Sequence, residues 1–203
     1  MDTLAGLHVS RETLEKLRIY QRLLEKWNPR INLVAPSTLA NAWERHFEDS
    51  AQLLFRLRAL PSLWGDLGSG GGFPGMVLAI LGREMAPDCG FVLVESDQRK
   101  TTFLQTVSRE TETPVRILAE RIEQAAPLGA GVVTARALAP LNRLLPLIQR
   151  HMSPEATILL PKGRNYQQEL DEVRDNFAFS LEVLPSYVDA DSVILKIENL
   201  RNV

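Results

Sequence analysis

The sequence predicts an α/β fold with a mostly parallel sheet and an N-terminal helical extension. A glycine-rich turn joins a short apolar run, 63–67, to an apolar helical stretch, which is typical of the first βαβ unit of such a sheet. Apolar runs then alternate with helical patterns, and the last two runs, 179–188 and 193–197, predict an antiparallel pair. Because Leu60-Pro61 marks a boundary, we divide the chain into residues 1–60 and 61–203.

Composition limits the classes of function. At 203 residues the chain suits one α/β domain with an extension, and its formal net charge of -2 means that any nucleic-acid-binding surface must be local. Cys89 is the only cysteine, which excludes a disulfide or a cysteine metal cluster within one chain, and we expect no metal site. No apolar run approaches the roughly 18 residues of a membrane span, and no secretory signal opens the chain. We therefore expect a cytoplasmic protein that has no membrane partner and acts as a monomer.

An amphipathic helix is predicted near the start of the chain. Apolar residues from Leu14 to Trp27 recur at spacings of three and four, with Ser10 as the N-cap and Asn28-Pro29 as the end. The other side of this helix is basic, which indicates either a solvated face or a surface that faces phosphates. Residues 1–9 give no clear signal.

A second helix is predicted from Ser37, which would cap it. Its buried stripe would consist of Trp43, Phe47 and Leu54. His46 and Asp49 lie three positions apart and so share one helical face. Ser50 does not stand on a G-x-S-x-G turn, and the segment has no H-E-x-x-H zinc motif. We interpret this group as a local hydrogen-bonded cluster.

The glycine-rich turn predicts a ligand that lies against the backbone. Its residues follow G-x-G-x-G from Gly68, whereas the dinucleotide fingerprint needs a third glycine where Phe73 stands. Pro74 lacks an N–H near the helix start, which favours a ligand without a pyrophosphate. A turn without a ligand is the weaker interpretation, because so many glycines cost folding entropy. With Asp66 ahead of it, the pattern Asp-x-Gly-x-Gly-x-Gly resembles the first motif of the S-adenosylmethionine (SAM) methyltransferases.

Later strand ends bring further candidates. Glu95 follows the second predicted strand, 91–94, roughly 20 residues beyond the glycines, and suits a ribose hydroxyl pair; a surface carboxylate is the alternative. Residues 120–123 follow a third strand, at the place where an adenine ring would lie in such a fold. The fourth strand, 132–135, runs into Arg136, which can pair with a carboxylate or phosphate; an internal salt bridge is the alternative. A fifth strand, 157–160, ends at Pro161-Lys162-Gly163.

Six segments carry an ordered set of motifs: Trp27-Asn28 with Asn32-Leu33, Arg45-His46 with Asp49-Ser50, Asp66 to Gly75, Arg121-Ile122-Glu123, Ala135-Arg136-Ala137 and Lys162-Gly163. Over nearly the whole chain this set resembles the bacterial 16S ribosomal RNA (rRNA) guanine-N7 methyltransferase family, RsmG, also called GidB. At Phe73 the family also has leucine. A glycine turn alone is weak support, whereas the ordered set is strong.

The resemblance implies a Rossmann-like SAM-dependent methyltransferase with a mostly parallel seven-stranded sheet and an antiparallel last pair, formed by residues 61–203. It implies methyl transfer from SAM to N7 of one guanine in the 530 loop of 16S rRNA, near the decoding centre, with the rRNA or the 30S ribosomal subunit as partner. The SAM contacts carried over by position are Gly68, Gly70, Phe73, Glu95, Ile122, Glu123 and Arg136. The candidates for the catalytic edge that faces the rRNA are Arg121, Arg136 and Lys162.

The implied chemistry agrees with what the sequence lacks. There is no N-P-P-Y or D-P-P-Y tetrad and no cysteine placed to attack a pyrimidine. N7 of guanine has a lone pair in the ring plane and no proton to lose, so alignment matters more than a general base. We hypothesise that Arg121 or Arg136 orients the guanine or its phosphate, and that Arg136 also holds the SAM carboxylate. The local basic patch would comprise Arg99, Lys100, Arg116, Arg121, Arg136, Arg143, Lys162 and Arg164.

Three alternatives stay open at the level of the sequence. One is a methyltransferase of the same fold that acts on a small molecule or a protein. Another is a nicotinamide oxidoreductase, which Phe73 and Pro74 disfavour. The third is a non-catalytic module that binds rRNA or a ribosomal protein, in which the glycine turn and Glu95 would be relics.

Overall fold

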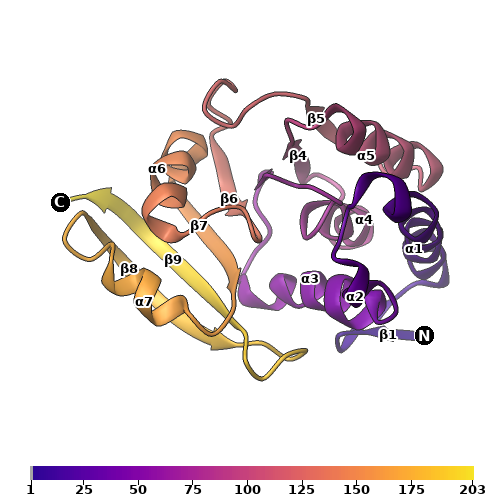
Figure 1. Ribbon diagram of the computed structural model, residues 1–203, viewed down its shortest axis with the longest axis horizontal. Coiled ribbons are helices and arrows are strands. Elements are labelled where there is room, and N and C mark those ends of the chain that lie inside the picture. Colours follow the sequence, from indigo (N-terminus) through magenta and orange to yellow (C-terminus); the bar gives the residue numbers. More distant parts are fainter. Residues whose placement is uncertain (1) are drawn as a thin grey trace.

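A seven-stranded sheet with the strand order β5-β4-β3-β6-β7-β9-β8 forms the centre of the protein (Figure 1). The computed structural model describes residues 2–203. Strands β3 to β7 run parallel, and β9 runs antiparallel to both β7 and β8, as predicted. The strands are β3 (Leu63–Leu67), β4 (Gly90–Val94), β5 (Arg116–Leu118), β6 (Ala130–Thr134), β7 (Met152–Lys162), β8 (Phe177–Pro185) and β9 (Val193–Asn202).

The strand order reverses between β3 and β6. The chain first moves outward from β3 through β4 to β5, and then returns to place β6 on the other side of β3. Such a reversal leaves a crevice at the carboxyl ends of the two central strands, where open α/β sheets bind their ligands. The topology thus fixes where the site is to be sought.

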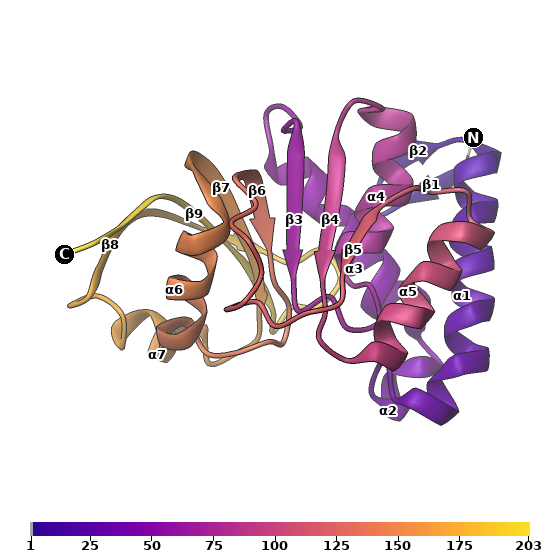
Figure 2. The same ribbon diagram turned by 90° about the horizontal axis from the view of Figure 1, so that it is seen from above.

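Helices cover both faces of the sheet. The helices and shorter helical turns are α1 (Arg11–Ile31), α2 (Pro36–Leu39), η1 (Trp43–Glu48), α3 (Asp49–Ala51), η2 (Gln52–Arg56), α4 (Gly75–Met85), α5 (Gln98–Glu110), α6 (Leu141–His151) and α7 (Tyr166–Asp171). Seen from above, α1 lies beside α5 at one end of the sheet, and α6 and α7 lie toward the other end (Figure 2).

Strand β4 shows why helices must pack on both faces of the sheet. Phe91 and Leu93 join the hydrophobic cluster that contains residues of α1, α4 and α5. Val92 and Val94 join the cluster that contains residues of α6 and α7. Alternate side chains of a strand point to opposite faces, so a strand that is apolar throughout must be buried on both.

The N-terminal segment packs into the core of one face. Leu17, Tyr20 and Leu24 of α1 are fully buried and belong to the same cluster as α4 and α5. The division of the chain at Leu60-Pro61 stays a prediction.

Helix α1 begins as predicted and ends later. The Ser10 hydroxyl oxygen accepts a hydrogen bond from the Thr13 backbone N–H, which confirms the N-cap. Asn28-Pro29 does not end the helix, which continues to Ile31 and is closed by Asn32 in the left-handed conformation. That prediction was wrong because a proline in the last turn removes one backbone donor without preventing the turn from closing behind it.

The second helix is broken into short pieces. Ser37 is not its cap: α2 begins at Pro36, and no side chain caps it. The segment resumes as the π-helical η1, continues into α3 and tightens into the 3-10 turn η2. Phe47 and Leu54 are buried as predicted, whereas Trp43 is half-buried and has the Arg18 guanidinium 4.0 Å from its ring centre.

The first residues form an unpredicted hairpin. Strands β1 (Asp2–Leu4) and β2 (Leu7–Val9) pair antiparallel around Ala5 and Gly6, which both have positive φ. Strands of three residues are too short to show a periodicity, and the turn lacks the Asn-Gly or Asp-Gly signal.

The bounds of the closing strands differ from those of the apolar runs that predicted them. β7 begins at Met152 rather than at residue 157, β8 occupies Phe177–Pro185 rather than 179–188, and β9 continues to Asn202 rather than to residue 197. Backbone pairing continues through exposed polar residues that carry no apolar signal.

Candidate active site at the carboxyl ends of β3 and β6

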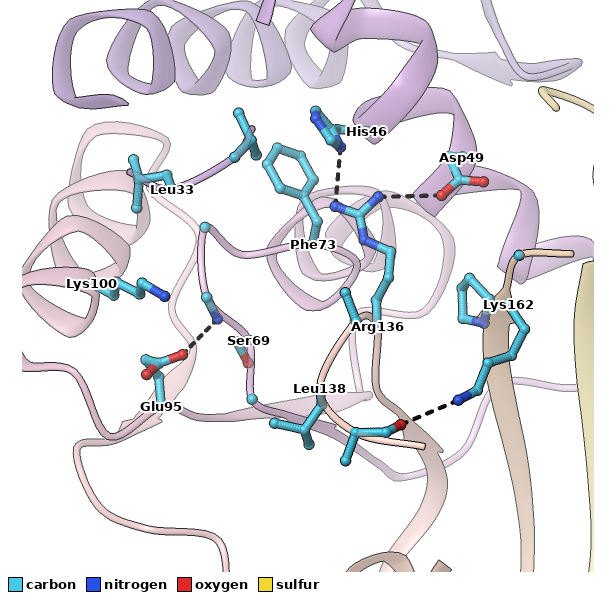
Figure 3. Close-up of a pocket in the computed structure, with 18 of the residues that line it drawn as sticks. Leu33, His46, Asp49, Ser69, Phe73, Glu95, Lys100, Arg136, Leu138 and Lys162 are labelled. Carbon is cyan, nitrogen blue, oxygen red and sulfur yellow. Dashed lines mark hydrogen bonds and ion pairs between the residues drawn. The ribbon is translucent and has the colours of Figure 1, made fainter. Parts of the chain in front are cut away.

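One large cavity of about 1320 Å³ lies at the carboxyl ends of the central strands. Its walls come from the loops after β3 to β7, from residues 33–49 of the N-terminal segment and from the connection between β8 and β9 (Figure 3). It brings together every predicted site residue, namely Gly68, Gly70, Phe73, Glu95, Arg121, Ile122, Glu123, Arg136 and Lys162.

Glu95 holds the glycine loop in place. The backbone N–H of Gly68 donates to the Val94 carbonyl at 2.9 Å, so the loop closes over the end of β4. The two oxygens of Glu95 accept from the N–H groups of Gly70 and Asp97, each at 2.8 Å. The carboxylate is therefore fixed at the cavity wall by two backbone donors, of which Figure 3 shows one.

Packing within the protein explains several of the glycines. A Cβ at Gly72 would collide with Tyr20, and one at Gly75 would lie 2.6 Å from Asp66. Close approach of the protein's own atoms therefore requires glycine at these two positions, whatever ligand the loop binds. Gly70 differs: its φ is +56°, and a Cβ there would have one neighbour within 4 Å, a carbonyl oxygen at 3.9 Å. Gly70 lines the cavity, and the space beside it is open.

Asp66 joins the two central strands. It is buried, and its carboxylate accepts from the Thr134 hydroxyl at 2.7 Å and from the Gly75 N–H at 3.3 Å. The Trp64 indole N–H donates in turn to the Thr134 oxygen at 3.1 Å. Burial raises the pKa of Asp66, while these hydrogen bonds oppose the increase. Asp66 therefore supports the loop rather than facing the cavity.

The turn after β5 presents Ile122 to the cavity. Its side chain is nearly buried, while Arg121 and Glu123 on either side are exposed. The carbonyl of Ile122 lies 2.9 Å from Nε2 of the fully buried His151, at the end of α6. No pattern in the sequence indicates this support from His151.

Arg136 lies across the cavity from Glu95, and both terminal nitrogens of its guanidinium are engaged (Figure 3). Its Nη1 donates to Asp49 at 3.2 Å and to the Arg45 carbonyl at 3.4 Å, and its Nη2 lies 3.1 Å from Nδ1 of His46. The guanidinium also lies 5.2 Å from the centre of the Phe73 ring. The internal salt bridge that the sequence left open therefore exists.

His46 is a neutral link between Arg136 and the N-terminal segment. Its Nε2 lies 2.8 Å from the Thr38 hydroxyl oxygen, and that hydroxyl donates to the Ala35 carbonyl at 2.8 Å. Since Arg136 can only donate, we assign Nδ1 as the acceptor and Nε2–H as the donor. Burial, assisted by Arg136 and Arg45, lowers the pKa of His46 to about 3. Within the predicted local cluster the Ser50 hydroxyl donates to the His46 carbonyl, whereas the side chains of His46 and Asp49 bond to residues outside it, above all to Arg136.

Lys162 lines the cavity with its charge already compensated. Its Nζ lies 2.7 Å from a carboxylate oxygen of Glu169 and 3.2 Å from the Ala139 carbonyl, and its side chain is 11% exposed. Arg116 does not belong to the predicted basic patch, because it begins β5 and lines a smaller cavity at the opposite edge of the sheet. Within residues 2–203, no group of His, Cys, Asp and Glu side chains is arranged to hold a metal ion. No helix in the same part of the chain is long and apolar enough to cross a membrane.

Comparison with known proteins identifies the family. The GidB family model, described as rRNA small subunit methyltransferase G, matches residues 13–194. The chain belongs to this family. A ribosomal RNA small subunit methyltransferase G from Cereibacter sphaeroides is 48% identical over 98% of this chain and 97% of its own length. One from Ruegeria pomeroyi is 45% identical over 97% of this chain and 96% of its own length. The resemblance drawn from the six segments is confirmed.

Solved structures of other methyltransferases confirm the architecture. The magnesium protoporphyrin IX methyltransferase of Synechocystis PCC 6803, solved with bound SAM, aligns with a TM-score of 0.59 at 12% identity over 94% of this chain and 98% of that chain. The 16S rRNA methylase RmtB aligns with a TM-score of 0.56 at 16% identity over 96% of this chain and 77% of that chain. At such identities the likeness concerns the fold alone, which is that of the Rossmann-like SAM-dependent methyltransferases.

Proposed function

We propose that this protein transfers the methyl group of SAM to N7 of one guanine in the 530 loop of 16S rRNA. The observation that carries the proposal is the large cavity at the point where the strand order reverses, because the glycine loop, Glu95, Ile122 and Arg136 all line it. Membership of the GidB family supports rRNA as the substrate class. The protein would act in the cytoplasm, as a monomer, on the 30S subunit or its rRNA.

The residues of the wall fit SAM. The space beside Gly70 admits a ligand that a side chain would exclude. The oxygens of Glu95 each accept one backbone N–H and keep lone pairs for the two ribose hydroxyls. Ile122 offers an apolar edge to the adenine ring, beside Glu123. When bound, SAM supplies a methyl group activated by a positively charged sulfur.

The chain needs no general base for this reaction. The N7 lone pair forms the new N–C bond while the methyl–sulfur bond breaks with its electron pair on sulfur, and the guanine ring takes the positive charge without losing a proton. The site is consistent with that chemistry, because the acceptor nitrogen of His46 and an oxygen of Asp49 are both engaged by Arg136. What the residues supply is alignment and charge complementarity.

Arg136 would direct the acceptor guanine and the SAM carboxylate. Its Nε–H has no acceptor within residues 2–203, and the residue lines the cavity, so this donor is available to guanine O6, to a phosphate or to a carboxylate. Lys162, which Glu169 neutralises, would close the wall and contribute little to rRNA affinity.

Methyl transfer to small subunits tests the proposal. Labelled SAM is added to 30S particles from cells that lack this gene, and the modified nucleotide is mapped. Label at N7 of a single 530-loop guanine is expected. Label elsewhere on the rRNA would overturn the assigned position, label on a protein or small molecule would overturn the substrate class, and failure to bind SAM would indicate a non-catalytic module.

Arg121 is proposed to contact an rRNA phosphate. Its side chain is exposed at the rim, and no hydrogen bond or ion pair engages it within residues 2–203. Arg121→Ala should weaken 30S binding, reduce the salt slope of that binding by about 1 and leave the Kd for SAM unchanged. Arg116→Ala, which removes an exposed arginine at the opposite edge, is the matched control and should change neither quantity. Lost SAM binding with unchanged RNA binding in Arg121→Ala would contradict this division of roles.

A further inference from the structure

Arg136 must be held rigidly if it is to direct a ligand. A free arginine side chain has many rotamers, and ordering it costs up to roughly 2 kcal/mol of conformational entropy. Here the guanidinium is enclosed before any ligand arrives: Asp49, His46 and the Arg45 carbonyl receive its N–H groups, and Phe73 lies under it. All of these except Phe73 come from the N-terminal segment, whereas Arg136 follows β6.

We propose that His46 and Asp49 are positioning residues, which fix the guanidinium of Arg136 in the geometry that methyl transfer requires. The inference rests on the proposed function of the site. Neither residue needs to touch the substrate, because each acts through the orientation of Arg136.

The His46 side of this arrangement is anchored at both ends. Thr38 receives the Nε2–H and is itself held by donating its proton to the Ala35 carbonyl. Rotation of the ring would break both this bond to Thr38 and the bond from Arg136. With Nε2–H committed, Nδ1 presents a lone pair to Arg136 at 3.1 Å. The Phe73 ring lies 5.0 Å from the imidazole and limits its tilt.

The Asp49 side is anchored as well. One carboxylate oxygen receives Arg136, and the other receives Nε2 of Gln52 at 2.9 Å. Gln52 is fully buried, donates also to the Ser186 hydroxyl and accepts from the Tyr187 N–H. Through Gln52, the connection between β8 and β9 therefore fixes the orientation of the Asp49 carboxylate.

The chain permits a matched pair of variants at His46. In His46→Asn, the amide oxygen can occupy the place of Nδ1 and still accept from Arg136. In His46→Gln, the amide can occupy the place of Nε2 and bond to Thr38, but nothing accepts from Arg136. A residue that merely holds the N-terminal segment should tolerate the glutamine better, whereas a positioning residue should tolerate the asparagine better.

The experiment measures kcat and KM on unmodified 30S particles, with thermal unfolding of each variant as a folding check. We expect kcat/KM to fall about 10²-fold in His46→Gln and to stay within about threefold of wild type in His46→Asn. We expect the loss in His46→Gln to disappear when Arg136→Lys is already present, since lysine lacks the planar fork that His46 orients. Asp49→Asn, which removes the charge and keeps the shape, should also lower kcat/KM.

The outcomes separate this inference from the proposed function. If wild-type protein modifies no 30S guanine, the proposed function fails. If wild type is active and His46→Gln keeps full activity, or if both His46 variants lose activity equally, the positioning role fails. An equal effect of His46→Gln in the wild-type and Arg136→Lys backgrounds would also overturn it.

Discussion

His46 illustrates how the surroundings decide the chemistry of a residue. An imidazole beside a carboxylate is often taken for a general base, but the nearest charges here are Arg136 and Arg45, with Asp49 engaged by Arg136. Burial and these two cations favour the neutral ring, so the pKa falls to about 3. A neutral imidazole with a fixed tautomer is suited to accept one hydrogen bond and donate another.

The shifted pKa of His46 predicts a pH-dependent stability. The unfolded chain, with a His pKa near 6.5, binds a proton more readily than the folded protein, so this residue makes stability fall as pH drops from about 6.5 toward 3. Between pH 7 and pH 5, wild type should lose roughly 2 kcal/mol more of its free energy of unfolding than His46→Asn. Denaturant titrations of both proteins at the two pH values measure the difference. Equal losses would show that His46 titrates normally when folded.

Residues at strand ends could be predicted, whereas their supports could not. Gly70, Glu95 and Arg136 each follow an apolar run, and parallel topology brings such positions to one edge of the sheet. His151 and Gln52 reach the site from segments 29 and 134 residues distant from their partners Ile122 and Ser186. No local pattern in the sequence records such pairings.

At the scale of elements, the glycine loop owes its shape to its neighbours. It passes beneath α1, where the hydroxyl of Tyr20 donates to the Gly71 carbonyl and its ring stacks on Phe73 at 5.2 Å. The loop is thereby sandwiched between the N-terminal helix and the sheet. Its glycines remove the side chains that would separate these layers.

Two glycines with positive φ test this explanation. Gly72 has a φ of +92°, and a Cβ there would lie 2.9 Å from both Leu104 and Met76; Gly129 has a φ of +67° and nothing within 4 Å. Gly129→Ala should cost about 1 kcal/mol of backbone strain. Gly72→Ala adds overpacking and should cost about 3 kcal/mol. Denaturant unfolding measures both, and equal costs would mean that the crowding at Gly72 relaxes freely.

Elements with continuous apolar runs were predictable, and short irregular ones were not. The clearest case is β4, where Phe91 to Val94 are apolar and buried on both faces; β3, β4 and β6 lie within two residues of the predicted runs, whereas β7 begins five residues earlier than predicted. The hairpin at residues 2–9 and the π turn η1 depend on tertiary contacts that local propensity does not encode. The π turn matters most, because it carries His46 toward Arg136.

At the scale of the molecule, the cavity is assembled from distant parts of the chain. The N-terminal segment supplies one wall, the loops after the central strands line the middle, and the connection between β8 and β9 supplies another wall. Figure 3 shows Leu33, His46 and Asp49 of the first wall facing the loops. Among the contacts that tie the N-terminal segment to the connection between β8 and β9, two differ most in exposure: those of the buried Gln52, and the ion pair of Arg45 with Asp189 at 2.7 Å. Their environments imply very different contributions.

The buried contact should dominate the stability of this assembly. Gln52→Leu removes the partners of Asp49 and of the Tyr187 N–H inside the protein, and should cost about 3 kcal/mol of unfolding free energy. The Arg45–Asp189 pair is partly exposed, so a double-mutant cycle with alanine should give a coupling of only about 0.5 kcal/mol. Denaturant unfolding of the five proteins measures both values. If the ion pair proved the stronger link, attachment of the N-terminal segment would depend on ionic strength. If Gln52 proves the stronger link, attachment persists in salt, and the salt dependence of the 30S reaction then reports rRNA binding alone.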